Sequence, residues 1–329
     1  MFTLSSEISI GNLRKVKPAK VDWKTDVNSY VDTCSIDLPR IKYLVTDKLS
    51  TEDKSELNAR KEYLVKEGDA VDVLLGYDGR NDRRFKGFVR RVVQGIPVKV
   101  ECEGYAYLLY DVIFNKSYSS TTAKQIVTDL CQGLDIIIST EIPNIPLQNV
   151  RFKNATGIQV LDWLKDECKL AVYFNFNELY VGTLFGKSQK TVKLKLGWNT
   201  IKDDNFKQRE LDKNVKINII EKNIKGEVKR TPADVQKYSN EKDVKVKAGI
   251  PSELLKQIAN RLQTKSNYGG HQGDIELFLE PHFNKGFVAN IDGFRYSEKS
   301  GNYFVEAVKG SFGRNGGRQT IELTFLQQL

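Results

Sequence analysis

The chain has 329 residues and a formal net charge of +9, with 40% hydrophobic and 10% aromatic residues. This length allows two or three domains, each with its own core, and the composition is that of a folded soluble protein. No apolar run approaches the roughly 20 residues of a membrane span, and the N-terminus lacks the basic and apolar regions of a signal peptide. We therefore expect a protein made in the cytoplasm, without a membrane segment or signal peptide.

Four cysteines stand far apart in the chain: Cys34, Cys102, Cys131 and Cys168. No two of them have the close spacing of a zinc-binding or redox-active pair. Three fall within segments that we expect to form strands or helices. We therefore predict buried, reduced thiols in place of disulfide bonds or metal ligands.

The N-terminal third is predicted to form strands at 7–10, 20–23 and 32–38. Apolar and polar residues alternate there, which is the period of a strand with one buried face. Residues 47–62 are polar and charged. We expect them to form a long excursion or an exposed helix.

The same alternation continues over 68–74, 85–92 and 97–103. Between the first two runs, Gly79 lies where a hairpin turn over 77–81 requires a positive φ. These runs predict a β-meander of small-barrel type. They hold none of the residues that a catalyst would use.

After the meander the pattern changes to that of helices. Thr122 and Gln125 have the spacing of a capping box, and Thr156 and Gln159 repeat it 34 residues later. The strands that we expect after the helices are 135–138, 171–174 and 178–182. Because β-strands follow each helix and only two copies exist, we interpret this part as one duplicated helix–strand unit, not as a tetratricopeptide array.

The positive charge is concentrated in residues 187–250, which hold 17 Lys plus Arg against 9 Asp plus Glu, a net +8. We predict strands at 191–196 and 215–219, and a protruding hairpin or mobile loop over 223–247. Such a segment can consist of solvated strands, or it can meet an acidic protein, an anionic membrane or nucleic acid. Its basic residues are nearly all lysines and aromatics are sparse, which argues against sequence-specific nucleic-acid binding.

A third helix is predicted to begin at Pro251 and to end at 269–270. Its buried stripe is expected to be Leu254, Leu255, Ile258, Ala259 and Leu262. A second meander completes the chain, with strands at 274–278, 287–291, 303–308 and 320–325. Turns at 301–302 and 315–317 are expected to separate these strands.

Together these elements predict a mainly β fold with an α/β insertion (α+β), built from two small β-barrel-like domains and helix–strand units. We predict three domains. Residues 1–112 form the first β-barrel-like domain, and residues 113–200 form the duplicated helix–strand α/β domain. Residues 201–329 hold the lysine-rich hairpin region, the third helix and the second β-barrel-like domain.

Several runs of the sequence share a pattern with one known family. Residues 68–73 read G-x-x-V-x-V, residues 85–89 read F-x-G-x-V, and the strand over 98–103 ends in acidic residues. Residues 120–126 match a threonine-rich helix cap, 301–305 match a G-x-Y-x-V strand, and 312–318 match a glycine-rich C-terminal hairpin. In this order the runs resemble the baseplate hub proteins of contractile-tailed phages. Those are the Mu-like or late-control tail proteins, related to the N-terminal part of type VI secretion spike proteins.

The resemblance covers most of residues 65–329 and implies a structural role in a phage, a prophage or a phage-like contractile injection system. Hub proteins of this type form trimers whose two barrel-like domains per chain make a pseudo-hexameric ring. That ring would adapt a six-fold tail tube to a three-fold central spike. The implied partners are two further copies of the chain, the tail tube protein, the spike protein and the baseplate wedge proteins. The implied location is the tail baseplate of the virion, assembled in the bacterial cytoplasm.

Enzyme function is not expected, because candidate catalytic residues are few. The two histidines, His271 and His282, are both predicted to lie in turns or loops, and a metal touched by Glu280 and His282 would lack an evident third ligand. No G-x-S-x-G run and no phosphate-binding glycine loop is present. Two acidic pairs are interpreted as solvated surface groups: Asp203 with Asp204, and Asp166 with Glu167. We expect no catalytic residue, no metal and no cofactor.

The alternative function is that of a carbohydrate- or peptidoglycan-binding β module on a cell or phage surface. It would need exposed aromatic side chains that stack on sugar rings. The candidates are Tyr105, Tyr107, Tyr110, Trp23 and Trp198, and the first two share a face if their strand continues. Packing in the core or in a subunit interface is the competing interpretation of these residues. A lectin can act as a monomer, whereas a hub must self-associate.

Overall fold

The computed structural model describes residues 3–39, 65–187, 189–210, 215–222, 228–232, 240–247 and 250–326. Within these ranges the chain is mainly β-structure, with one 13-stranded sheet, three smaller sheets and three α-helices. The predicted mainly β, α+β fold class is thus confirmed. The excursion or helix expected over 47–62 lies outside the described residues. In the described part of the chain, no helix combines the length and hydropathy needed to cross a bilayer.

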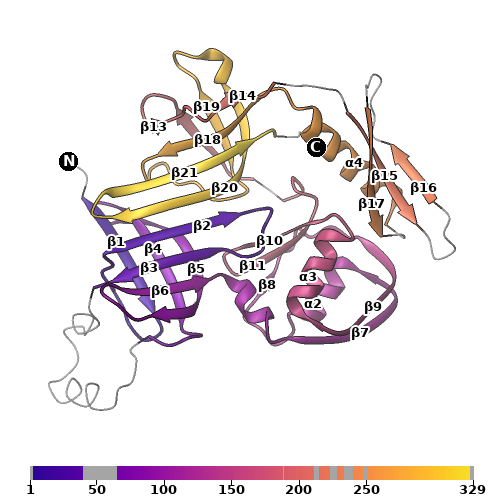
Figure 1. Cartoon of the computed structure of the whole chain (residues 1–329), viewed down its shortest axis with the longest axis horizontal. Helices are drawn as coiled ribbons and strands as arrows, with labels where there is room; N and C mark the ends of the chain where they lie inside the picture. The colour runs from indigo at the N-terminus through magenta and orange to yellow at the C-terminus, as the bar shows by residue number, and fades with distance from the viewer. Residues whose placement is uncertain are drawn as a thin grey trace.

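The N-terminal strands form a curved sheet of six strands in the order β1-β4-β5-β6-β3-β2, and we call this barrel-like part the first barrel (Figure 1). Their bounds are β1 (Leu4–Ile10), β2 (Lys20–Asp26), β3 (Thr33–Leu38), β4 (Ala70–Tyr77), β5 (Arg80–Val93) and β6 (Val98–Glu103). Buried residues alternate along each strand, as the sequence predicts, and form one apolar cluster. The turn between β4 and β5 consists of Asp78 (φ 51°) and Gly79 (φ 82°), the pair of positive φ angles that a two-residue hairpin requires.

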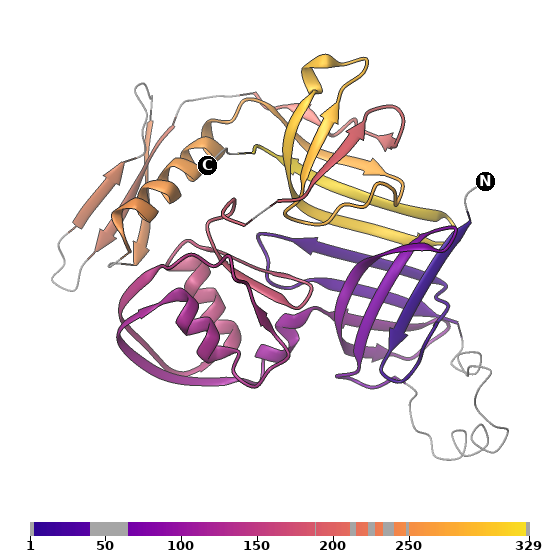
Figure 2. The same ribbon diagram turned by 180° about the vertical axis from the view of Figure 1, so that it is seen from behind.

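The helix–strand part contains a two-stranded ribbon that lies against two helices (Figures 1 and 2). Its elements are β7 (Ile113–Thr122), α2 (Ala123–Leu130), β9 (Pro146–Thr156) and α3 (Gly157–Asp166). A small sheet of β8 (Ile137–Ile138), β10 (Ala171–Asn175) and β11 (Glu178–Gly182) completes it. The repeat therefore also has a strand before each helix. Strands β7 and β9 were not predicted from the sequence, because both are rich in polar residues.

The two predicted capping boxes differ. At α3 both hydrogen bonds of the box are present. The backbone N–H of Gln159 donates to the Thr156 hydroxyl, and the backbone N–H of Thr156 donates to the side-chain oxygen of Gln159. At α2 the Thr122 hydroxyl accepts from the Gln125 amide, but the Gln125 side chain donates to Asp129 instead. Each threonine still ends its strand and begins its helix.

The second barrel contains four strands from the C-terminal part of the chain and three strands that precede helix α4 (Ser252–Asn267) in the sequence. The C-terminal strands are β18 (His271–Leu277), β19 (Val288–Asp292), β20 (Gly301–Gly313) and β21 (Gly316–Thr324); the earlier ones are β12 (Thr191–Lys195), β13 (Thr200–Lys202) and β14 (Lys207–Gln208). The turn expected at 301–302 is wrong, because these residues begin β20. The connection is the loop over 293–300, which contains the short 3-10 helix η3 (Ser297–Lys299).

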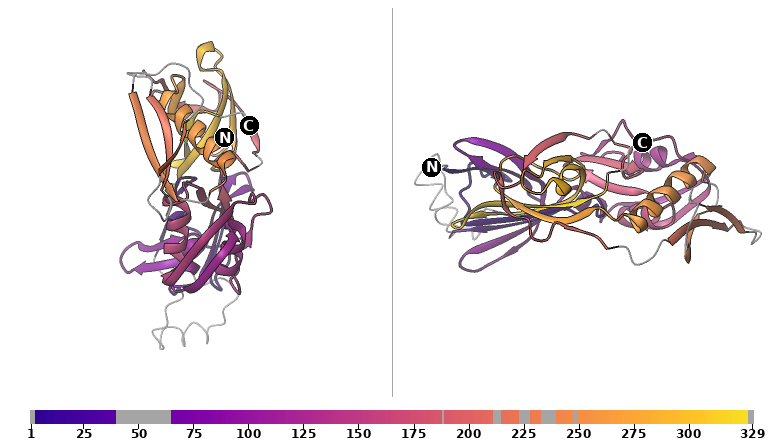
Figure 3. Two further views of the ribbon diagram at one scale, coloured as in Figure 1. Left: turned by 90° about the vertical axis from the view of Figure 1, so that its right-hand side faces the viewer. Right: turned by 90° about the horizontal axis from the view of Figure 1, so that it is seen from above.

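We call the part of the chain that holds the next three strands, 215–247, the lysine-rich region; its described residues differ from the protruding hairpin or loop that the sequence suggested over 223–247. It contains a three-stranded sheet of β15 (Val215–Lys222), β16 (Val228–Pro232) and β17 (Asn240–Lys247), in which β17 runs parallel to β15 on the edge opposite β16. Helix α4 (Ser252–Asn267) packs on this sheet through the predicted apolar stripe. Seen from above, α4 and its sheet lie at the end of the molecule opposite the first barrel (Figure 3).

Candidate functional site

The two barrels share one continuous sheet. Strand β2 of the first barrel pairs with β20 of the second over seven residues, from Lys20 opposite Gly313 to Asp26 opposite Ala307. At the middle of this joint Trp23 lies opposite Gly310 and is buried. A Cβ atom at position 310 would overlap the Trp23 ring, so only glycine fits there.

A buried polar network forms a second link between the barrels. Arg84 of β5 donates to the Leu279 carbonyl at 2.8 Å and to the Gln319 side chain at 3.3 Å. Gln319 is fully buried and its amide nitrogen lies 2.6 Å from the Pro281 carbonyl. Burial lowers the pKa of Arg84 to about 10, so its side chain stays charged near neutral pH. The network fixes the loop before β19 against the first barrel.

A buried ion pair forms the third link. Lys285 of the second barrel lies 2.5 Å from Asp32 of the first, and the two side chains are 1% and 8% exposed. The Lys285 ammonium also lies 5.8 Å from the centre of the Tyr173 ring in β10. Three parts of the fold therefore meet at this lysine. The pair joins residues far apart in the chain, and nothing in the local sequence indicates it.

The residues considered for metal binding have other contacts. His271 begins β18, where a turn was expected, and its ring packs on Phe206. Glu280 and His282 both lie beside Asp82, whose carboxylate is 3.5 Å from the His282 imidazole and close to the Glu280 carboxyl. Among the residues that the structure describes, no three His, Cys, Asp or Glu side chains are arranged to hold a metal ion.

His282 is expected to make stability depend on pH. Burial and the nearby Arg84 lower the pKa of His282 from 6.5 to about 4, so the unfolded chain binds this proton first as the pH falls. At pH 5 we expect the folded state to lose about 2 kcal/mol of stability relative to pH 8 through this one group.

The variant His282→Gln cannot titrate, so subtracting its pH profile from the wild-type profile isolates the contribution of His282. The difference should grow between pH 6.5 and 4 in urea unfolding. The pKa of Glu280 is raised, so this group makes the folded state more stable as the pH falls. Its contribution is present in both proteins and cancels when the two profiles are subtracted. Parallel profiles for the two proteins would contradict the prediction.

The other acidic candidates and the cysteines lie in ordinary environments. Asp203 pairs with Lys299 at 2.9 Å and Asp204 with Lys202 at 3.1 Å. Glu167 ends α3 at the surface. All four cysteines are buried and free, as predicted.

The aromatic candidates divide into buried and exposed groups. Tyr105 is buried in a 3-10 helix, η2 (Tyr105–Leu109), so the strand does not continue and the condition for Tyr105 and Tyr107 to share a strand face is not met. Tyr107 stacks on Phe88, and Arg90 lies 4.9 Å from the centre of the Tyr110 ring. Tyr105, Tyr107 and Tyr110 therefore have packing contacts within the chain, which is the competing interpretation of these residues.

Trp198, by contrast, is 70% exposed at the end of the second barrel. The Lys195 ammonium lies 4.8 Å from the centre of its ring and 4.8 Å from that of Phe294. Phe294 and Tyr296 are also more than half exposed. We call Trp198, Phe294 and Tyr296 the aromatic patch. Only Trp198 of these three was a candidate from the sequence, because the parallel pairing of β12 with β19 brings the loops that follow these strands together.

The basic groups of the lysine-rich region are only partly free. Arg230 of β16 lies 3.3 Å from Asp243 of β17, across the central strand β15, and Lys229 donates to the Ser252 hydroxyl at 3.3 Å. Exposed ion pairs of this kind contribute little to stability. Because basic residues outnumber acidic ones over 187–250, these ion pairs do not neutralise the positive charge of this part of the chain.

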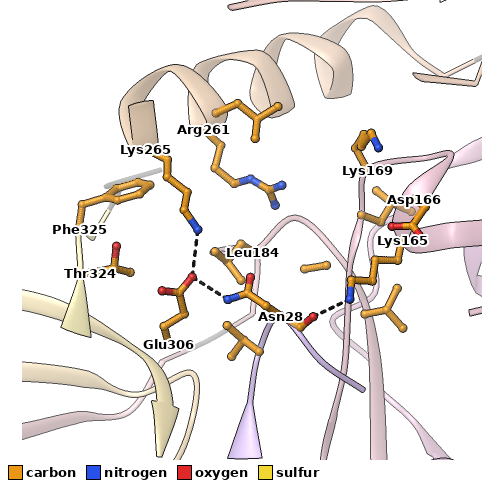
Figure 4. A pocket seen from close by; sticks show the side chains of 15 residues that line it. Asn28, Lys165, Asp166, Lys169, Leu184, Arg261, Lys265, Glu306, Thr324 and Phe325 are labelled. Carbon is orange, nitrogen blue, oxygen red and sulfur yellow. Dashed lines mark hydrogen bonds and ion pairs between the residues drawn. The ribbon is translucent and has the colours of Figure 1, made fainter. Parts of the chain in front are cut away.

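A cavity of about 210 Å³ lies where α4 meets the body of the molecule (Figure 4). On one side Glu306 accepts hydrogen bonds from Lys265 at 3.2 Å and from the Asn28 side chain at 2.7 Å. On the other side Lys165 donates to the Asn28 backbone carbonyl at 2.6 Å. Arg261 points from α4 into the space between them (Figure 4).

Solved structures that match this fold include phage tail proteins and type VI secretion proteins. A tail protein from Neisseria meningitidis matches 98% of this chain and 96% of its own length, at 12% identity and a TM-score of 0.67. The 43 kDa tail protein of prophage MuSo2 from Shewanella oneidensis matches 98% of both chains at 13% identity, also at 0.67.

A component of a bacterial secretion system also matches this fold. An Escherichia coli component of the type VI secretion system, described as similar to the T4 tail proteins gp27 and gp5, matches 98% of this chain and 77% of its own length, at 11% identity and 0.55. No family model and no curated protein matches the sequence. The predicted resemblance to tail proteins of this class is confirmed at the level of the fold.

Proposed function

We propose that this chain is the baseplate hub of a contractile phage tail or phage-like injection apparatus. In this proposal three copies form a ring that adapts the six-fold tail tube to the three-fold central spike. The observation that carries it is the match in fold to phage tail proteins over nearly the whole chain. The role is structural, without catalysis, and the site of action is the tail baseplate of a virion, prophage or related device.

The joints between the barrels support a hub. Three chains with two barrels each give six β modules around an axis, which suits a six-fold tube only if the two barrels of a chain hold a fixed relation. The β2–β20 pairing and the two buried polar links provide that rigidity. The division into 1–112, 113–200 and 201–329 stays a prediction.

Self-association tests the proposal directly. Light scattering on the purified 37.5 kDa chain should show a species of three times that mass that persists on dilution. Permanent interfaces typically bury at least about 2,000 Å², so dissociation at micromolar concentration is not expected. A monomer at every concentration would contradict trimer formation by the isolated chain.

Partner binding is proposed to use the lysine-rich region. The net charge of +8 belongs to residues 187–250, which include this region and the short strands β12–β14, and it suits an acidic surface on the tube or wedge proteins. Reversing the charge of Lys222, Lys225, Lys229 and Arg230 together should slow association with such a partner, most strongly at low salt. Unchanged binding would contradict the proposed electrostatic contact.

A carbohydrate-binding module is the second candidate. The aromatic patch supports it, because exposed rings can stack on sugars and form a platform beside Lys195. A glycan array distinguishes the two functions. If the wild-type protein is a monomer that binds a glycan, and Trp198→Ala loses this binding, the carbohydrate-binding module is favoured.

A further inference from the structure

The cavity beside α4 has an unusual balance of charges. Six ionisable residues line it: the basic Lys165, Lys169, Arg261 and Lys265 and the acidic Asp166 and Glu306. Glu306 already accepts hydrogen bonds from Lys265 and Asn28. The excess of positive charge therefore falls on the part of the wall that holds Arg261 and Lys169.

Arg261 lacks a direct partner within the described part of the chain. It is partly buried, and no described residue forms a hydrogen bond or ion pair with its guanidinium. Glu306 attracts it only from a distance, and burial lowers the pKa of Arg261. A guanidinium withdrawn from water favours a planar anion that accepts two parallel hydrogen bonds. Lys169 faces the same cavity and is also without a partner among the described residues.

The rest of the wall is mostly apolar. Leu184, Leu262 and Phe325 line the cavity between the charged groups. A volume of about 210 Å³ is too small for a typical cofactor but large enough for several water molecules or one small organic molecule. The wall thus presents positive charge for a carboxylate and apolar surface for a short hydrocarbon.

We propose that this cavity binds a small organic carboxylate. Arg261 and Lys169 hold the carboxylate, and Leu184, Leu262 and Phe325 contact the hydrocarbon part. Bound there, the molecule connects α4 to the body and stabilises the attachment of the lysine-rich sheet. This site is independent of the hub function, because it requires only the folded chain.

Thermal unfolding of the full chain tests the site. At constant ionic strength, replacing sodium chloride with sodium glutarate should raise Tm, and the rise should grow with the logarithm of the glutarate concentration. Arg261→Met should weaken glutarate binding at least about tenfold, the effect of losing a charge-assisted hydrogen bond. In chloride alone this variant should be no less stable than the wild type, because it removes an unpaired charge.

Lys256→Met is the matched control, since Lys256 is exposed on the same helix and does not line the cavity. It should keep the full response to glutarate. Absence of a glutarate-dependent rise in the wild type, or an equal rise in Arg261→Met, would overturn the proposal. Stabilisation by inorganic phosphate but not by glutarate would also overturn it, because the ligand would then not be an organic carboxylate.

A spectroscopic measurement covers the case in which Arg261→Met fails to fold. In the wild type, glutarate should shift the Nε–Hε resonance of Arg261 in a ¹H–¹⁵N spectrum. Arg261→Lys, which keeps the charge but not the paired donors, assigns that signal and should bind glutarate more weakly. An Arg261 signal that does not move at saturating glutarate would contradict the site.

Discussion

Lys285→Met should lower the free energy of unfolding by about 3 to 5 kcal/mol. The substitution leaves the Asp32 carboxylate, which is almost fully buried, without its only ion-pair partner among the described residues. Burial already raises the pKa of Asp32, against the attraction of Lys285, and the variant should protonate this carboxyl on folding. Urea unfolding at pH 7 measures the loss.

Two further variants control this prediction. Adding Asp32→Leu to Lys285→Met removes both charges and should recover most of the stability, because the penalty comes from the unpaired charge. Lys309→Met breaks an exposed pair with Asp274 and should cost less than about 1 kcal/mol. A loss in the double variant as large as in the single one would show that packing, not charge, sets the effect.

Gly310→Val should destabilise the chain by about 3 kcal/mol, near the upper end for overpacking. The new side chain overlaps the Trp23 ring on the paired strand, so β2 and β20 must move apart where the barrels join. In the proposed hub the same change should reduce trimer formation before it abolishes folding. Chemical unfolding and light scattering report these two effects separately.

Gly95→Ala is the comparison for that variant. The atom nearest to a Cβ at position 95 lies 3.4 Å away, an ordinary contact, so this substitution should change stability by less than about 0.5 kcal/mol. If Trp23→Ala is combined with Gly310→Val, the overlap disappears. The two substitutions should then be strongly non-additive, as expected for residues in contact. Simple addition of their effects would argue against the Trp23 overlap as the cause.

Local pattern was sufficient for most elements. The β4–β5 hairpin was predictable because alternation and a glycine with positive φ are both properties of neighbouring residues. The same holds for α3, where the residues of the capping box lie three apart. The ribbon strands β7 and β9 were missed because their exposed faces and polar sequences give no alternation to detect.

The candidate sites were much less predictable. Arg84 and Gln319 are separated by 235 positions, and Lys285 and Asp32 by 253. In the sequence each is a polar residue of the kind usually found at the surface. Arg261 likewise has the appearance of a solvated helix residue. Its placement in a cavity depends on how α4 packs against the body.

The type of most elements, the buried state of the cysteines and the resemblance to tail proteins could be predicted from the sequence, because these depend on local period and on the order of segments. Only the tertiary structure decided that the two barrels share one sheet and that charged groups are buried at their joints. Strand pairing and burial are set by contacts between distant segments, so the same lysine can be a surface group in one packing and an inter-barrel link in another.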